Sequence, residues 1–402
     1  MELLIYLILF LLVLIVSSTT NKLLPFLPLP LVQILLGIVI GLFLPNTDFH
    51  LNTELFLALV IGPLLFRESE EADITAILKH WRIIIYLIFP VIFISTLSLG
   101  GLAHLLWFSL PLAACLAVGA ALGPTDLVAF ASLSKRFSFP KRVSNILKGE
   151  GLLNDASGLV AFQVALTAWT TGAFSLGQAS SSLIFSILGG FLIGFLTAMI
   201  NRFLHTFLLS VRATDIASEL LLELSLPLVT FFLAEEVHVS GIIAVVVAGI
   251  LKASRFKKIT LLEAQVDTVT ETVWHTVNFM LNGSVFVILG MELEMIAEPI
   301  LTNPIYNPLL LLLSLIALTF VLFAIRFIMI YGYYAYRTRR LKKKLNKYMK
   351  DMLLLTFSGV KGTVSIATIL LIPSNLEQEY PLLLFLVAGV TLVSFLTGLL
   401  VL

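Results

Sequence analysis

Long apolar runs separated by short polar segments make up almost the whole chain. A helix that crosses a bilayer needs a mostly apolar stretch of about nineteen residues. The apolar stretches are 1–18, 24–44, 51–66, 82–108, 110–134, 146–169, 180–205, 217–236, 239–254, 272–296, 308–336, 351–373 and 382–402. The pattern predicts an all-α polytopic membrane protein with about 13 transmembrane helices.

Composition supports this prediction and excludes several classes of protein. Of the 402 residues, 59% are hydrophobic and 12% charged, and the mean hydropathy of +1.05 is too high for a soluble domain. The net charge is +1, and the one strong basic cluster, Arg337 to Lys350, lies between two apolar segments. It is typical of a loop beside the membrane, so we expect no nucleic-acid partner. Cys115 is the single cysteine, which leaves no disulfide or thiolate metal cage within the chain, and we expect no cofactor.

Basic residues predict the orientation in the membrane. Of the 25 Lys and Arg residues, all but Lys148, Arg326 and Lys361 fall in odd-numbered loops or at the span ends that adjoin these loops. Positively charged loops stay in the cytoplasm, so the amino terminus is predicted outside and the odd loops and carboxyl terminus inside, in a multi-pass protein of the cell membrane. The first apolar segment has no basic region or cleavage pattern typical of a signal peptide, so we interpret it as the first transmembrane helix.

Two predicted spans contain helix-breaking residues near their middles. Gly123 and Pro124 interrupt the fifth span, and Gly359 and Gly362 interrupt the twelfth. The two spans hold matching positions in two triplets, the fourth to sixth and the eleventh to thirteenth, which are an odd number of spans apart. Such triplets must run in opposite directions, the arrangement of an inverted-repeat transporter with two broken, crossing helices near 123–126 and 358–362.

Each break carries one charge, Asp126 in the first and Lys361 in the second. If the helices cross at their breaks, two helix amino ends face each other and two carboxyl ends do the same. Asp126 would then offset the positive pair of ends and Lys361 the negative pair. The alternative is a simple kink at Gly123 and Pro124, with Asp126 capping the next half-helix.

The sixth span carries Glu150, Asn154 and Asp155 in an otherwise apolar run. Glu150 and Asn154 share a helix face, and Asp155 lies about 100° further round. Arg326, in the middle of the eleventh span, cannot face lipid and is the predicted ion-pair partner of Glu150. Asp155 then remains as the acid for which a proton and a cation compete. The alternative is a core carboxyl bonded to hydroxyl or backbone groups.

Several motifs together resemble the prokaryotic branch of the monovalent cation:proton antiporters of the sodium/proton exchanger type, in the expected order and over nearly the whole chain. These are GPTDLVAF at 123–130, EGLLNDASGLV at 150–160, LAEEVHVSGIIAVVVAGI at 233–250, NGSVFVILGMEL at 282–293, AIRF at 324–327 and SGVKGTVSIA at 358–367. FLALVIGPLLFRE at 56–68 is also similar to the third helix of the family. The resemblance implies a homodimer in which a core moves against a fixed interface domain.

The resemblance also implies roles for matching residues. Asp155 matches the acid that binds cation and proton in turn, and Asn154 stands where electrogenic relatives have a second Asp, which implies electroneutral one-for-one exchange. Thr125 and Asp126 match the unwound-helix cation site, so the transported Na⁺ would bind at Asp155, Asp126 and Thr125, beside Asn154. Glu150 and Arg326 match the structural ion pair. Lys361 matches the Arg of a GxRG motif, and Gly151 replaces a common Ser, which bears on sodium selectivity.

The function predicted from the sequence is exchange of Na⁺ or Li⁺ for H⁺ by alternating access, with K⁺/H⁺ exchange as the nearest alternative. A cation channel and an intramembrane aspartyl hydrolase are remote alternatives; otherwise the chain is not an enzyme. The expected domains are interface helices at 1–80 and 213–300, core helices at 81–169 and 301–402, and a linking helix at 170–212. Glu223 is expected at a helix end or along the cytoplasmic funnel.

Overall fold

A computed structural model describes the chain apart from residues 1, 25–26, 44–52, 127–129, 131–138, 173–175, 212–214, 254–260, 303–305, 341, 343–344, 373–379 and 402. The described residues form helices and connecting segments without any strand. Contacts divide the chain into two compact units. Unit 1 comprises 1–48, 75–174 and 283–402, and unit 2 comprises 49–74 and 175–282.

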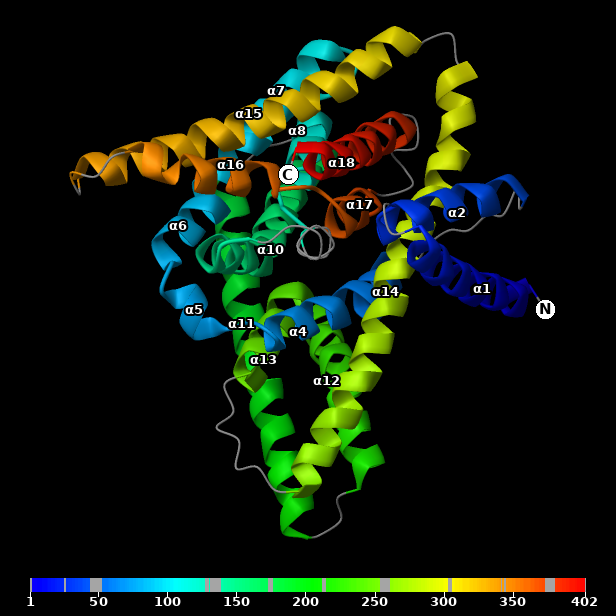
Figure 1. Ribbon diagram of the computed structural model, residues 1–402, viewed down its shortest axis with the longest axis vertical. Coiled ribbons are helices and arrows are strands. Elements are labelled where there is room, and N and C mark those ends of the chain that lie inside the picture. The colour runs from blue at the N-terminus through cyan, green and yellow to red at the C-terminus, as the bar shows by residue number, and fades with distance from the viewer. Residues whose placement is uncertain are drawn as a thin grey trace. The chain divides into compact units, whose positions relative to one another are not determined.

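Unit 1 contains most of the predicted site residues. Its helices are α1 (Glu2–Leu23), α2 (Leu29–Phe43), α5 (Ile74–Leu78), α6 (Trp81–Tyr86), α7 (Ile92–Leu106), α8 (Leu112–Ala121), α10 (Lys141–Thr171), α15 (Pro308–Arg340), α16 (Met349–Phe357), α17 (Thr363–Ile369) and α18 (Tyr380–Val401), with the single-turn helices η2 (Leu87–Val91) and η3 (Leu345–Tyr348). Helix α14 (Leu261–Thr302) enters unit 1 from Gly283 onward. Figure 1 shows α16 and α17 as separate orange segments joined by a non-helical stretch.

Unit 2 is also helical. It contains α3 (Thr53–Phe56), η1 (Leu57–Ile61), α4 (Gly62–Glu70), α11 (Leu176–Ser210), α12 (Ile216–Glu236), α13 (Gly241–Ala253) and α14 up to Asn282. Helix α12 begins at a capping box, in which Asp215 accepts a hydrogen bond from the Ser218 backbone N–H and the Ser218 hydroxyl accepts one from the Asp215 backbone N–H. These bonds satisfy donors that a helix start otherwise leaves unpaired.

Local sequence explains several helix ends near the site. Helix α10 follows Pro140 and ends at Gly172, whose positive φ of 66° is accessible to glycine at little cost. Pro308 opens α15, where a missing N–H costs nothing. Pro90 lies in η2, a π-helical turn that connects α6 to α7. The wider π-helical turn accommodates a residue that has no backbone N–H to donate. The sequence therefore sets these boundaries directly.

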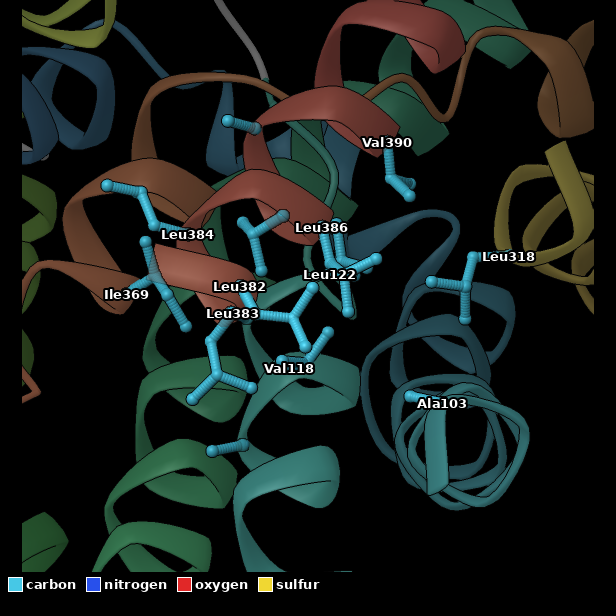
Figure 2. Close-up of a cluster of buried hydrophobic side chains, with 14 of the residues drawn as sticks. Ala103, Val118, Leu122, Leu318, Ile369, Leu382, Leu383, Leu384, Leu386 and Val390 are labelled. Atoms are coloured by element: carbon cyan, nitrogen blue, oxygen red, sulfur yellow. The ribbon is translucent and has the colours of Figure 1, made fainter. Parts of the chain in front are cut away.

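The core of unit 1 is a cluster of buried aliphatic side chains from α7, α8, α15, α17 and α18. Figure 2 shows Val118 and Leu122 from the α8 segment gathered with Leu382, Leu383 and Leu386 from α18. Helices approach most closely where side chains are absent: a Cβ added at Gly37 of α2 would collide with the Val287 carbonyl of α14. Small residues permit such backbone contacts between membrane helices.

Six helices in the described part of the chain are long and apolar enough to cross a bilayer, and they include the α6–α7 segment, α12, α15 and α18. Several shorter apolar helices accompany them, among them α2, α8 and α13. The amino-terminal half of the fifth predicted span is α8, while most of its second half falls outside the described residues. The length and number of apolar helices agree with a polytopic membrane protein.

Candidate cation and proton site

The two interrupted segments meet at their breaks. Helix α8 ends at Ala121 and the next five residues, through Asp126, are not helical; α16 ends at Phe357 and α17 starts only at Thr363. The backbone N–H of Asp126 donates to the Val360 carbonyl over 3.0 Å. A hydrogen bond between two non-helical stretches satisfies backbone groups that hydrocarbon could not. The breaks predicted from glycine and proline are therefore present and in direct contact.

Lys361 carries the positive charge of this crossing and is only 2% exposed. Its Nζ donates to the carbonyls of Gly123 over 2.7 Å and Pro124 over 2.6 Å, at the end of α8. Its backbone N–H donates to the Ser394 hydroxyl on α18. Carbonyls at a helix carboxyl end carry partial negative charge, so the ammonium group both pairs them and offsets that charge.

Asp126 carries the negative charge of the crossing and lies where α17 begins. The residue is buried, and its carboxylate is so close to Gly362 that a Cβ added there would collide with Asp126 Oδ2. Gly362 is the residue at the amino end of α17. The absence of a side chain at position 362 thus permits the carboxylate to approach a helix end with partial positive charge.

Glu150 and Arg326 form a two-pronged ion pair between α10 and α15. Arg326 Nη1 donates to Glu150 Oε1 over 2.6 Å and Nη2 to Oε2 over 2.8 Å. Both residues are buried, and Arg326 Nε also donates to the Leu355 carbonyl of α16. Gly359 leaves space for the guanidinium, because a Cβ there would collide with Arg326. The geometry is that of a strong, fully desolvated carboxylate–guanidinium pair.

Thr125 connects this ion pair to Asn154. The Thr125 hydroxyl donates to Glu150 Oε1 over 3.3 Å and accepts from Asn154 Nδ2 over 2.7 Å. Asn154 Nδ2 also lies 3.3 Å from the Thr125 carbonyl. Asn154 Oδ1 is buried and has no hydrogen-bond partner among the described residues. A buried amide oxygen with spare acceptor capacity is suited to bind a cation or a water molecule.

Asp155 follows Asn154 in α10, but its side chain lies outside the described residues. The structure thus brings together Thr125, Asp126, Glu150, Asn154, Arg326 and Lys361 from the two breaks, α10 and α15. The backbone position of Asp155 in the same helical turn as Asn154 agrees with a location beside this cluster.

Sequence reasoning missed one contact of the crossing in unit 1 and a separate set of contacts in unit 2. Ser394 accepts from the Lys361 backbone, and the only signal for it was a small polar residue in an apolar helix. In unit 2, Glu223 Oε2 lies 2.8 Å from Lys252 Nζ, and Glu223 Oε1 accepts from Trp274 Nε1 over 2.9 Å. The helix-end prediction for Glu223 did not include this pairing between α12, α13 and α14.

Comparison with known proteins places the chain in a family. Residues 7–402 match the family described as "Sodium/hydrogen exchanger, transmembrane". The chain is 35% identical over 393 residues to the "Sodium, potassium, lithium and rubidium/H(+) antiporter" of Bacillus pumilus, covering 96% of this chain and 59% of that protein. The Bacillus subtilis protein of the same description is 35% identical over 385 residues, which cover 94% of this chain and 57% of the relative. The chain spans about three fifths of the length of these relatives.

The fold also matches a solved structure. The sodium proton antiporter MjNhaP1 from Methanocaldococcus jannaschii superimposes with a TM-score of 0.67 at 19% identity, covering 100% of this chain and 95% of that one. The chain therefore belongs to the sodium/hydrogen exchanger family of integral membrane proteins. This confirms the resemblance drawn from the motifs, the all-α polytopic fold, and the prediction of a transporter family in place of an enzyme family.

Proposed function

We propose that the chain exchanges Na⁺ or Li⁺ for H⁺ across the cell membrane. The observation that carries the proposal is the contact between the two interrupted segments, with Lys361 bonded to the carbonyls at one break and Asp126 against the glycine at the other. Broken helices that cross at a membrane midplane create an ion site from backbone and side-chain oxygens, held by compensating charges. Family membership supports the same function.

In this proposal Asp155 binds the cation and the proton in turn. Oxygen atoms of Thr125, Asp126 and Asn154 complete the cation site, since monovalent cations prefer carbonyl, carboxylate and hydroxyl oxygens. Either ligand neutralises Asp155, whereas an empty carboxylate costs on the order of several kcal/mol to desolvate in an occluded state. Because only the site that holds a cation or a proton moves across the membrane, the flux of cations is coupled to the flux of protons. Glu150 and Arg326 stay paired, so they hold α10 against α15 without taking part in the exchange.

Asn154 supports a one-for-one, electroneutral exchange. Its amide is already committed to Thr125 and carries no charge, so Asp155 is the single acid that this pair of positions offers to ligands. One carboxylate that binds either one proton or one monovalent cation moves no net charge per cycle. An exchange rate that does not change with an imposed membrane potential is therefore expected.

Domain roles, orientation and assembly complete the proposal. Helices in 81–169 and 301–402 form the moving core, those in 1–80 and 213–300 form the interface of a homodimer, and 170–212 links them. This division describes expected motion and differs from the two contact units, since unit 1 also includes 1–48. Odd-numbered loops and the carboxyl terminus are cytoplasmic. Crosslinking of single-cysteine variants in intact cells tests both the dimer and the sidedness.

The direct test uses everted membrane vesicles with a pH-sensitive dye. Addition of Na⁺ or Li⁺ should raise the internal pH of acidified vesicles that contain the protein, and Asp155→Asn should abolish the response. Asn145→Asp, a change on the partly exposed part of α10, is the matched control and should leave it intact. Retained exchange in Asp155→Asn would contradict the assignment of the site.

K⁺/H⁺ exchange at the same site is the second candidate. It is favoured by the two Bacillus relatives, whose description includes potassium and rubidium together with sodium and lithium. Gly151 contributes no hydroxyl to the site, which agrees with a loose selection among monovalent cations. Titration of the vesicle response with Na⁺, Li⁺ and K⁺ separates the two. Conductance in a planar bilayer, or peptide cleavage that depends on Asp126 and Asp155, would instead support the channel or the aspartyl hydrolase.

A further inference from the structure

Helix α15 has one buried and one exposed line of side chains, each repeating every fourth residue. The buried line consists of Ser314, Leu318, Leu322, Arg326, Ile330, Tyr334 and Thr338. The opposite line contains Leu312, Ile316, Phe320 and Ile328, all well exposed, with Phe320 at 72%. Positions four apart are neighbours on a helix surface but are turned by about 40°, so the exposed line is a continuous stripe that winds round α15 where the described chain leaves it uncovered.

The chemistry of the exposed line changes along its length. It is aliphatic and aromatic from Leu312 to Ile328, a rise of about 24 Å, which matches most of a hydrocarbon core of about 30 Å. Two turns later comes Tyr336, which is 68% exposed, and one turn after it Arg340, also exposed. The order apolar, Tyr, Arg is the order in which hydrocarbon, interface and headgroups follow each other in a membrane.

A cluster of exposed bases gathers at this end of α15. We name as the basic end the six described residues Arg337, Arg339, Arg340, Lys342, Lys347 and Lys350, each of which is exposed. No carboxylate among the described residues forms an ion pair with any of them. Their charge is therefore available to an external anion.

Contacts next to the basic end hold its two parts, the end of α15 and the segment with η3, together. Arg142 Nη2 donates to the Tyr334 hydroxyl over 3.3 Å, and Arg142 Nη1 lies 3.6 Å from Asp351 Oδ2. The rings of Tyr334 and Tyr348 are 5.4 Å apart, and the Arg142 guanidinium lies over both. These contacts tie η3 and the start of α16 to the end of α15, so that Lys347 and Lys350 belong to the same end of the unit as Arg340. They also satisfy Asp351, the one acid in the segment from 337 to 351.

We infer that the basic end of α15 binds the phosphate headgroups of anionic phospholipids, with Tyr336 at the interface and the Leu312–Ile328 line in the acyl chains. A cluster of four to eight bases directly beside a membrane helix attracts anionic lipid strongly. The apolar line that leads into the cluster favours a lipid over a soluble anion, because a lipid has both acyl chains for the apolar line and a charged headgroup for the bases. The binding is independent of the ion-exchange cycle and of the residues proposed to carry it.

The test measures lipid association with the full chain in phosphatidylcholine vesicles. Spin-labelled phosphatidylglycerol should associate with the protein more than spin-labelled phosphatidylcholine does, and the preference should fall as ionic strength rises. Arg339→Gln/Arg340→Gln should lower the preference by about fivefold for each base removed. Arg339→Lys/Arg340→Lys should retain most of it, and Lys22→Gln/Arg202→Gln, two exposed bases on α1 and α11, should change it little.

Three outcomes would overturn the inference. The first is an unchanged preference in Arg339→Gln/Arg340→Gln. The second is an equal loss in Lys22→Gln/Arg202→Gln, which would mean that net charge and not this cluster attracts the lipid. The third is full displacement by inorganic phosphate at matched ionic strength, which would indicate a soluble anion as the ligand. Each readout is binding alone, so a failure of cation/proton exchange would leave the result interpretable.

Discussion

Arg326 on α15 donates two hydrogen bonds, of 2.6 and 2.8 Å, to the carboxylate of Glu150 on α10. Helix α10 also carries Asn154 and Asp155. Both charges are almost completely buried. The pair determines how the two helices are arranged more than it stabilises the fold, since a buried ion pair gains little net free energy over an apolar pair of similar shape. The pair fixes the rotation of α10 and with it the direction in which Asn154 faces Thr125.

Removal of one partner of this pair should therefore cost more than removal of both. Glu150→Gln or Arg326→Gln alone leaves a buried charge without its counter-ion, with an expected loss of about 3–5 kcal/mol in the free energy of unfolding. The double variant should lose less than either single variant. Thermal unfolding of purified protein, with membrane abundance as a second readout, completes the double-mutant cycle. Additive losses would show that the two charges are not coupled.

Lys361 should tolerate Arg but not Met. Lys361→Met leaves the buried carbonyls of Gly123 and Pro124 without a donor, which should reduce the free energy of unfolding by at least about 2 kcal/mol. Lys361→Arg keeps the charge and the donors, at some cost in fit within a buried space. The melting temperature and the rate of cation-dependent proton movement should both be highest in the wild type, lower in Lys361→Arg and lowest in Lys361→Met. A Lys361→Met variant as stable as the wild type would contradict the proposed charge compensation.

Gly362 should be indispensable because of Asp126. An alanine Cβ at position 362 would collide with Asp126 Oδ2, whereas a Cβ at Gly101 meets nothing within 4 Å. Gly362→Ala should therefore impair exchange and lower the melting temperature, while Gly101→Ala, in helix α7, should be neutral or slightly stabilising. Vesicle exchange and thermal unfolding of the two variants are compared at equal expression. A neutral Gly362→Ala would mean that the carboxylate does not need its position against α17.

Asn154→Asp should destabilise the protein although it changes few atoms. The Thr125 hydroxyl already donates its proton to Glu150, so a carboxylate at position 154 would face the Thr125 hydroxyl and carbonyl oxygens without a donor from either. The expected loss is about 1–3 kcal/mol, the cost of a buried acceptor left unpaired. Asn145→Asp is the matched control on the same helix. Thermal unfolding measures both, and equal melting temperatures would contradict the hydrogen-bond assignment.

His80 should make stability fall at acid pH. It lies in the turn before α6, outside the membrane-spanning segments, and burial together with nearby Arg142, Lys79 and Arg337 lowers its pKa below the usual value. The unfolded chain therefore takes up the proton first. The folded state loses no stability from this group above about pH 6.5 and loses it progressively below that value, until the folded-state pKa is passed.

The measurement for His80 is the melting temperature as a function of pH. His80→Gln should show a smaller decrease between neutral pH and pH values below the usual histidine pKa than the wild type does. Asn145→Gln, at a partly exposed position of α10 that does not titrate, serves as the control for the mutation itself and should follow the wild type. Identical pH profiles of wild type and His80→Gln would contradict the predicted effect.

Much of the architecture could be predicted from sequence because the bilayer restricts the choices so strongly. Apolar segments of sufficient length must be helices. Pro124 cannot complete the hydrogen bonds of a regular helix, and Gly359 and Gly362 make an interruption of the twelfth span easy without forcing it. The helices of the described chain lie close to the predicted stretches. Boundaries were less accurate: α10 begins at Lys141 and α14 extends to Thr302, because helices continue beyond the hydrocarbon where hydropathy no longer marks them.

The partners of individual side chains could be predicted only where alternatives were few. A lone Arg326 and a lone Glu150 in hydrocarbon leave each other as the obvious choice. Ser394 and the Leu355 carbonyl had no such signal, since hydroxyls and carbonyls are common in every helix. Asn154 gave no sign that its amide would be committed to Thr125, because that bond depends on how close α10 lies to the break after α8.

The sequence by itself determined that this protein is a helical membrane protein with two broken helices, each with one charge of opposite sign, and it identified the family through ordered motifs. Only the tertiary structure decided which backbone groups those charges contact: Lys361 contacts the carbonyls of Gly123 and Pro124, and the Asp126 carboxylate lies against Gly362. Hydropathy and helix breakers act on neighbouring residues and can be read locally. Pairing between positions more than two hundred residues apart depends on how the helices pack.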